Sequence, residues 1–213
     1  MIRIYIIQED ENQEETYIPF GSGTYYEHNG LPMVISADHV LGSFTARTRT
    51  LAACHPYDWK YELMQQCVHI TPGPISWTLD NRDVAISFLD GFLTEATSAN
   101  IHLDYDWTIG EFIVIAHNGG GPAVSPGVIS WGMDSRSVEY DGSAWPGSSG
   151  GGVFNGYGEL IGVIHSVIVL PAPWSGPGGR EIADGHKIFA LLPANFITTL
   201  NEDNSYPGET CHE

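Results

Sequence analysis

The sequence predicts an all-β fold, either a sandwich or a barrel, and three observations support this. Helical periodicity is scarce, whereas short alternating or β-branched runs are frequent. Glycine, proline, asparagine and aspartate separate these runs, a spacing that is typical of all-β proteins. The pattern loosens over residues 94–106, with roughly six strand-like runs on either side. We therefore expect two halves joined by a link in this region.

The first half opens with an apolar run at residues 2–7, which an acidic loop follows at 9–15. Asn29-Gly30 separates two further runs, and this dipeptide suits the positive φ angles of a tight hairpin. The strands expected in this half cover residues 2–7, 24–27, 32–36, 44–50, 61–70 and 84–89.

The second half alternates strand-like runs with Gly- and Pro-rich loops at 118–126 and 171–185. A closing helix is expected at 193–200, because proline is favoured in a first helical turn. Residues 201–213 are polar and are expected to form a tail. The strands expected in this half cover residues 112–117, 127–131, 137–140, 152–155, 160–170 and 186–192.

The formal net charge is −18, from 26 acidic and 8 basic side chains. Such a surface repels phosphate backbones and anionic lipids, so neither nucleic acid nor a membrane is an expected partner. No run reaches the roughly 18 apolar residues that cross a bilayer. The apolar patch at residues 1–10 is too short for a signal peptide, and acidic residues follow it. We therefore expect an unprocessed, cytoplasmic chain.

Three cysteines, Cys54, Cys67 and Cys211, are too few and too sparse for a disulfide scaffold. A single bridge between Cys54 and Cys67 across a hairpin is left open. His55 and His69 lie near these two cysteines, but the spacing matches no usual zinc pattern. No metal and no cofactor are therefore expected.

The run Gly147-Ser148-Ser149-Gly150-Gly151 is poorly suited to the interior of a helix or strand. Glycines let a ligand approach the main chain closely, which a nucleophile with an oxyanion hole requires. Ser149 would be the nucleophile, with the N–H groups of Gly147 and Ser149 turned toward one point. Most Gly/Ser clusters are flexible loops, so the interpretation depends on finding a base and an acid.

Two residues upstream supply such a pair. His39 closely follows the apolar run at 32–36, and Asp83 directly precedes the run at 84–89. The order His39, Asp83, Ser149 is that of the chymotrypsin triad. Asp83 would hold His39 in one tautomer, and His39 would take the Ser149 proton and deliver it to the leaving amine.

Segments around these residues resemble the trypsin-like serine proteases, especially their bacterial high-temperature-requirement branch. The similarity extends in order over residues 17–200. The segments that carry it are residues 21–24, 34–41, 83–86, 110–118, 127–130, 141–151, 158–163 and 189–193.

The resemblance implies two six-stranded antiparallel β-barrels with a short C-terminal helix. The first barrel, at residues 1–100, would carry His39 and Asp83. The second, at 107–200 with the terminal helix, would carry Ser149, and the tail would follow at 201–213. The expected activity is serine endopeptidase, acting on peptide or protein substrates, and the oligomeric state is left open.

Two departures from the family pattern are informative. Ser148 stands where trypsin has an acid that pairs with a freed N-terminus, so activation by that salt bridge is not expected. The chain ends soon after the expected helix, which leaves no room for the PDZ domain of many relatives. A rival interpretation, the α/β-hydrolase elbow, needs a helix after the serine, but glycines and a strand follow Ser149.

The resemblance also frames a substrate pocket. Ser143 falls at its base with Ala144 and Trp145 beside it, so cleavage after Arg or Lys is not expected. The strand lining it would include Ile164, His165 and Ser166. Some relatives use a histidine here for acidic or amide side chains, but His165 is one residue out of register, and only a bulge would restore it.

Two substrate preferences are therefore left open, a Glu or Gln side chain and a small or medium apolar one. The alternative function is a catalytically silent module with a protease fold, used for binding or assembly.

Overall fold

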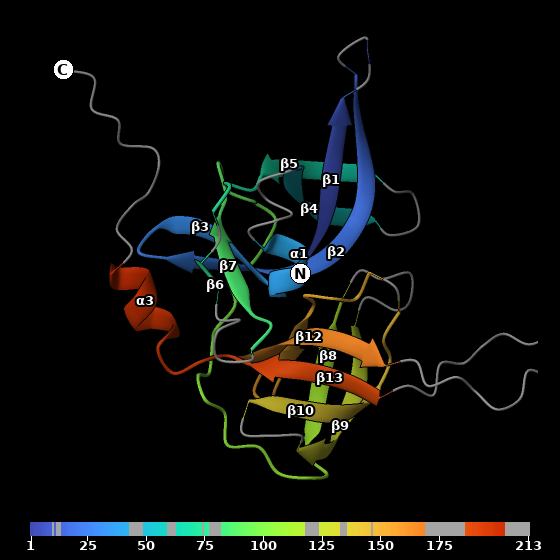
Figure 1. Ribbon diagram of the computed structural model, residues 1–213, viewed down its shortest axis with the longest axis vertical. Coiled ribbons are helices and arrows are strands. Elements are labelled where there is room, and N and C mark those ends of the chain that lie inside the picture. Colours follow the sequence, from blue (N-terminus) through green and yellow to red (C-terminus); the bar gives the residue numbers. More distant parts are fainter. Residues whose placement is uncertain are drawn as a thin grey trace, which may run out of the picture.

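The all-β prediction is confirmed by the structure, a computed structural model. It describes residues 1–9, 11, 14–42, 49–58, 63–73, 75–76, 82–117, 124–132, 136–145, 147–168 and 186–202. Within these ranges the chain forms two antiparallel β-sheets and two short helices. Figure 1 shows the N-terminal sheet above a barrel formed by the second half.

The N-terminal sheet has seven strands in the order β5-β4-β1-β2-β3-β7-β6. Its longest strand, β2, has a register shift against β1 between Ile4 and Tyr5. The strands are β1 (Ile2–Glu9), β2 (Glu15–His28), β3 (Leu31–Ser36), β4 (Thr50–Asp58), β5 (Leu63–His69), β6 (Ile75–Ser76) and β7 (Ala85–Phe88).

The ends of this sheet meet without forming a continuous ladder. One isolated bridge joins Ile70, just after β5, to Leu89, just after β7. Beyond this bridge the Thr71 N–H donates to the Phe88 carbonyl at 2.9 Å, and regular pairing with β7 resumes only in β6, after Pro72 and Gly73, which has a φ of +94°. The prediction of a closed six-stranded barrel is therefore wrong in detail for this half: over the described residues the sheet has seven strands and does not close into a barrel.

The C-terminal sheet is a closed barrel of six strands, as predicted, in the order β10-β13-β12-β11-β8-β9. Burial alternates along β9, as expected for a strand with one face toward a core. The strands are β8 (Phe112–Ala116), β9 (Val124–Gly132), β10 (Ser137–Gly142), β11 (Gly152–Phe154), β12 (Leu160–Ile168) and β13 (His186–Leu191).

Several predicted boundaries need correction. The strand expected at 24–27 is the end of β2, which starts nine residues earlier, at Glu15. A one-turn helix, α1 (Asp38–Leu41), follows β3 directly, and α3 (Phe196–Glu202) ends within the expected tail. The closing helix expected at 193–200 is thus present as α3, shifted toward the C-terminus, whereas α1 has too few residues for sequence periodicity to indicate it.

Some expectations fall on residues outside the described ranges. These are the loop at 171–185, most of the strand at 44–50, most of the loop at 118–126 and nearly all of the tail.

A shared hydrophobic core joins the two sheets. Tyr26 and Ile35 from the first sheet pack in one cluster with Leu160 and Val163 from the barrel, and Phe196 of α3 closes it. The ring of Phe196 contacts that of Tyr26 edge-on, with centroids 6.0 Å apart. This burial holds the two sheets against each other. The predicted domain boundaries, at residues 100 and 107, stay a prediction.

A disulfide joins Cys54 on β4 to Cys67, its partner on β5. The bridge left open by the sequence is therefore present, and it removes both thiols from any zinc site with His55 and His69. Disulfides are typical of oxidising compartments, so this one counts against the cytoplasmic location expected from the sequence. Among the described residues, no helix is long and apolar enough to cross a bilayer.

Replacing Phe196 by alanine should destabilise the protein by about 3–5 kcal/mol, because this fully buried ring joins both sheets to α3. Phe112→Ala is the matched control, since Phe112 is 52% exposed on β8 and its loss should cost under about 1 kcal/mol. Urea unfolding measures both. Equal losses would contradict the shared core.

Candidate active site

His39 is presented by the short helix α1. The N–H groups of Val40 and Leu41 both donate to the carbonyl of Ala37, which closes the turn immediately after β3. The side chains of Val40 and Leu41 are buried, whereas that of His39 is 48% exposed. The turn is therefore anchored in the core on one side and carries the imidazole on the other.

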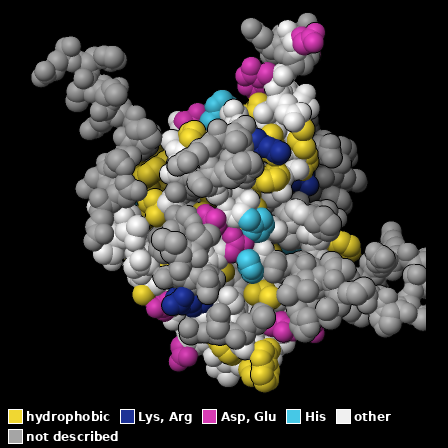
Figure 2. Space-filling model, in the orientation of Figure 1, with side chains coloured by type: hydrophobic (Ala, Val, Ile, Leu, Met, Phe, Trp, Pro, Cys, Tyr) yellow, Lys and Arg dark blue, Asp and Glu magenta, His cyan; other side chains and the backbone are white. Residues whose placement is uncertain are grey.

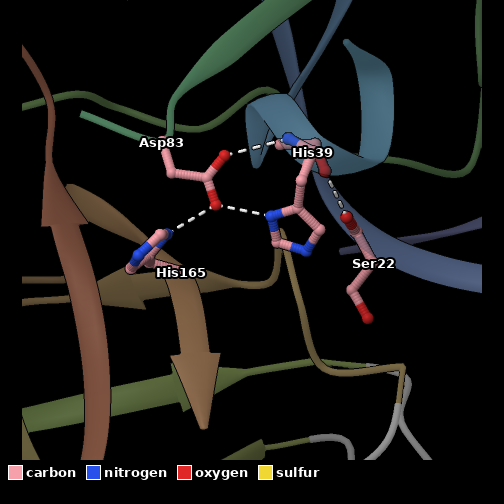
Figure 3. Close-up of polar contacts among 5 residues, drawn as sticks. Ser22, His39, Asp83 and His165 are labelled. Atoms are coloured by element: carbon pink, nitrogen blue, oxygen red, sulfur yellow. Dashed lines mark hydrogen bonds and ion pairs between the residues drawn. The ribbon is translucent and has the colours of Figure 1, made fainter. Parts of the chain in front are cut away.

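Asp83 lies directly before β7 and is nearly buried, and it contacts His39 at two points (Figure 3). Its Oδ1 accepts the backbone N–H of His39 at 2.9 Å, and its Oδ2 lies 2.5 Å from His39 Nδ1. An ionised carboxylate only accepts, so Nδ1 carries the proton and Nε2 keeps its lone pair. The Nε2 lone pair of His39 is therefore available to accept a proton.

The same contacts shift the acidity of both groups. The hydrogen bond to Asp83 raises the pKa of His39 above 6.5, against the opposing effect of desolvation. Burial alone would raise the pKa of Asp83, but hydrogen bonds from His165 and His39 outweigh it and hold that pKa well below its usual value. Asp83 therefore stays ionised at neutral pH.

The turn at residues 147–151 is held by its own groups. Gly147 and Gly150 have φ angles of +88° and +83°, which glycine adopts without strain. Ser148 is buried and forms two hydrogen bonds of 2.8 Å with the exposed Trp145, one from Ser148 N–H to the Trp145 carbonyl and one from Trp145 N–H to Ser148 Oγ. The Ser148 hydroxyl thus stabilises the turn through a hydrogen bond to its own backbone.

Ser22 on β2 ties this turn to the first sheet. Its N–H donates to the Ser149 carbonyl at 2.9 Å, and its Oγ donates to the Gly147 carbonyl at 2.7 Å. Ser36, two residues before α1, donates its hydroxyl to the Ser22 carbonyl at 2.7 Å. These contacts bring Ser149 to the segment that carries His39. Sequence reasoning missed the part that Ser22 and Ser36 play, although buried serines on apolar strands were a signal.

Three backbone and side-chain groups of the turn could bind a ligand. Within the described part of the chain, the N–H groups of Gly147 and Ser149 have no hydrogen-bond acceptor, and Ser149 Oγ has no hydrogen-bond partner. An oxyanion needs two such donors. Hydrogen bonds between catalytic groups often tighten only when substrate binds.

The expected pocket residues differ in their surroundings. Ser143 and Ala144 are half-buried and Trp145 is 50% exposed, so each offers some surface. The side chain of Ile164 is fully buried in the barrel core, so only its backbone could take part in the expected pocket. The backbone of Ile164 pairs with Gly150 and Gly151 at 2.8 Å. The side chain of Ser166 lies outside the described residues.

His165 contacts Asp83. The pairing of β12 with β13 shifts register between Ile164 and Ser166, which is where the sequence argument required a bulge. His165 Nδ1 lies 2.6 Å from Asp83 Oδ2, and the His165 and His39 rings are nearly perpendicular with centroids 6.4 Å apart. Figure 3 shows both rings converging on one carboxylate oxygen. This contact was not predicted, because Asp83 and His165 lie on different sheets.

These three residues are also the group, among those described, that could hold a metal ion. Their ligand atoms lie within 4.8 Å of one another. The separations of 2.5 and 2.6 Å between Oδ2 and the two Nδ1 atoms are hydrogen-bond distances. Ligands of one tetrahedral zinc ion are roughly 3.3 Å apart at the usual bond lengths. An ion would therefore have to break both hydrogen bonds.

The cluster is open to solvent. Figure 2 shows histidine and acidic side chains gathered in the middle of one face of the molecule. The side chains of His39 and His165 are 48% and 41% exposed, while that of Asp83 is only 10% exposed. A substrate can therefore reach the bases, and water has little access to the acid.

A comparison with known families identifies the class of protein, a protease-type hydrolase, and its family. The family model for the trypsin-like peptidase domain matches residues 21–163. The chain therefore belongs to the trypsin-like peptidases. A search of curated proteins finds no match. The matched range includes His39, Asp83 and Ser149.

Gly150→Ala should separate the turn from the first sheet. A Cβ at this position would lie 1.9 Å from Ser36 Oγ and 2.4 Å from the Ser22 carbonyl oxygen. Strain at the positive φ should cost about 1–2 kcal/mol, and overpacking roughly 1–3 kcal/mol more. Gly158→Ala is the matched control, because Gly158 also has a positive φ but nothing lies within 4 Å of its Cβ position. Equal free energies of unfolding for the two variants would contradict this packing.

Proposed function

We propose that this chain is a serine endopeptidase that uses a His39–Asp83–Ser149 triad. The observation that carries the proposal is the two-point contact of Asp83 with His39. A nearby glycine-rich turn offers a serine and two N–H groups that have no acceptor among the described residues. Membership of the trypsin-like peptidases supports the same conclusion.

In the proposed reaction, Ser149 Oγ attacks the carbonyl carbon of the scissile peptide bond while His39 Nε2 takes the hydroxyl proton. The N–H groups of Gly147 and Ser149 stabilise the oxyanion of the tetrahedral intermediate. The C–N bond then breaks, and the amine leaves with the proton from His39. Water repeats the sequence on the acyl-enzyme, which releases the acid product and restores Ser149.

Asp83 acts through His39. It fixes the imidazole with its Nε2 toward the nucleophile, and its negative charge stabilises the imidazolium that forms when the proton arrives. Because the pKa of Asp83 lies well below its usual value, the acid keeps this charge throughout the working pH range.

Substrate selection is proposed to depend on Ser143, Ala144 and Trp145. None of them is charged, so a small or medium apolar residue before the scissile bond fits better than Arg or Lys. The Nδ1 atom of His165 is hydrogen-bonded to Asp83. This contact argues against a substrate pocket in which His165 would bind a Glu or Gln side chain. The Ser148 side chain is hydrogen-bonded within its own turn. We therefore propose that the turn needs no salt bridge from a freed N-terminus to become active. The nearest branch is proposed to be the bacterial high-temperature-requirement one.

A fluorophosphonate probe should label the wild-type protein at Ser149 and leave Ser149→Ala unlabelled. Turnover of a peptide library should fall by a factor on the order of 10⁶ in Ser149→Ala and His39→Ala. Mass spectrometry locates the label. A folded wild-type protein that neither reacts with the probe nor cleaves any peptide would instead indicate the silent binding module.

The proposed base predicts the pH dependence. Proton transfer requires neutral His39, and the bond to Asp83 raises the pKa of this histidine above 6.5. The value of kcat/KM should therefore fall as the pH decreases through a midpoint above 6.5. A pH profile with saturating and limiting substrate tests this, and a midpoint well below 6.5 would contradict the Asp83 contact.

A further inference from the structure

Strands β8 and β9 carry an apolar patch on the outside of the barrel. More than half of the exposed large hydrophobic side chains in the described part of the chain lie on these strands or directly before them, and they are 41–62% exposed. Contiguous exposed apolar surface of this kind marks interaction sites in soluble proteins. The side chains of this β8–β9 patch are Ile109, Phe112, Val124, Val128 and Trp131.

Strand pairing makes members of the patch neighbours. Phe112 on β8 is paired with Val128 on β9, so their side chains lie side by side on one face. Val124 lies on the same face as Val128, because side chains four positions apart in a strand point the same way. A register shift in the pairing of β9 with β10 places the exposed Trp131 opposite Glu139. The patch therefore spans two strands.

The side chains that β9 turns inward are smaller than those it turns outward. Ser125 and Gly127 are buried, whereas Val124, Pro126 and Val128 are exposed. A shift of one residue in register would bury the larger set, but the pairing of β9 with both β8 and β10 holds it outside. These apolar side chains therefore contribute little to the core of the barrel, and contact with another molecule accounts for them.

The patch lies away from the candidate active site. In the closed order β10-β13-β12-β11-β8-β9, β9 is opposite β12, and β12 is the strand that contacts β3 of the first sheet. Figure 1 shows β9 on the side of the barrel that is farthest from the first sheet. A molecule bound to the patch therefore leaves His39 and Asp83 accessible to substrate.

Carboxylates border the patch on β10. The exposed Asp141 is paired with Val128, and Glu139 is paired with Trp131. The whole chain has a formal net charge of −18. A second copy of the chain or an anionic membrane would bring more negative charge to this border, and like charges repel. Charge complementarity therefore favours an occupant that carries positive charge.

We propose that the β8–β9 patch docks an amphipathic segment of a partner protein, with apolar residues on one face and lysine or arginine at its edge. The apolar residues of the partner cover Phe112, Val128 and Trp131, and its cations approach Asp141. Tryptophan is enriched among the residues that carry most of the energy of an interface, and complementary charge fixes how the partner is oriented. This inference does not depend on the proposed catalytic function.

The test uses a Ser149→Ala background, so that the probe cannot be cleaved. The probe is a fluorescein-labelled peptide of leucine and lysine whose leucines lie on one face of a helix, and fluorescence anisotropy measures its Kd. It should bind at least about tenfold more tightly than a scrambled peptide of the same composition, or than a leucine–glutamate peptide of the same pattern.

Variants of the patch should weaken this binding. Trp131→Ala should raise the Kd by about tenfold or more. Phe112→Ala should also raise it, and serves as the second variant if Trp131→Ala fails to fold. Asp141→Asn should raise the Kd by about threefold at low salt and by less at high salt, because the ion pair is exposed.

Two matched controls lie elsewhere on the surface. Tyr157→Ala removes an aromatic side chain that is 91% exposed, in the turn between β11 and β12, and Glu9→Gln removes an exposed carboxylate at the end of β1. Both should leave the Kd unchanged.

Three results would overturn the proposal. The first is a Kd that neither Trp131→Ala nor Phe112→Ala changes. The second is a dimer, seen by sedimentation velocity, that Trp131→Ala dissociates, which would make a second copy the occupant. The third is binding to phosphatidylcholine vesicles that Trp131→Ala abolishes, which would make the patch a lipid-binding surface.

Discussion

The candidate site depends on one contact between the two sheets, the pair of hydrogen bonds from Ser22 to the 147–151 turn. The proposed acid and base come from the first sheet and the proposed nucleophile comes from the barrel, so neither sheet holds a complete site. Ser22 reaches the carbonyls of Gly147 and Ser149, and Ser36 holds the carbonyl of Ser22. A rigid turn on a misplaced barrel would leave Ser149 out of reach of His39.

Apolar burial makes that placement stable. The cluster of Tyr26, Ile35, Leu160, Val163 and Phe196 packs across the junction, and such a core resists sliding because each side chain fills a particular space. The hydrogen bonds of Ser22 and Ser36 then determine how the 147–151 turn lies against the first sheet within this packed interface. His165 adds a polar contact at the same junction, since it reaches from the barrel to an acid on the first sheet.

The sequence predicted the parts of this molecule that local patterns encode. Alternation predicted most of the strands, and the positions of His39, Asp83 and Ser149 at the ends of apolar runs predicted the candidate site residues. Contacts between distant residues leave no such pattern. Ser22 and Gly147 are 125 positions apart, and Asp83 and His165 are 82 apart. The bulge at His165 depends on how β12 pairs with β13, and the opening of the first sheet depends on where its two end strands meet.

The isolated bridge between Ile70 and Leu89 is the place where the first sheet should open most easily. Separating β5 from β7 disrupts one bridge and a few flanking hydrogen bonds, whereas opening the barrel requires the loss of a whole ladder. Local openings follow the least costly route, so amide exchange and proteolysis reach the first sheet along this edge before they reach the barrel. Asp83 directly precedes β7, and the far end of β7 adjoins this bridge at Leu89. An opening that spreads along β7 would therefore disturb the acid before it disturbs the serine in the barrel.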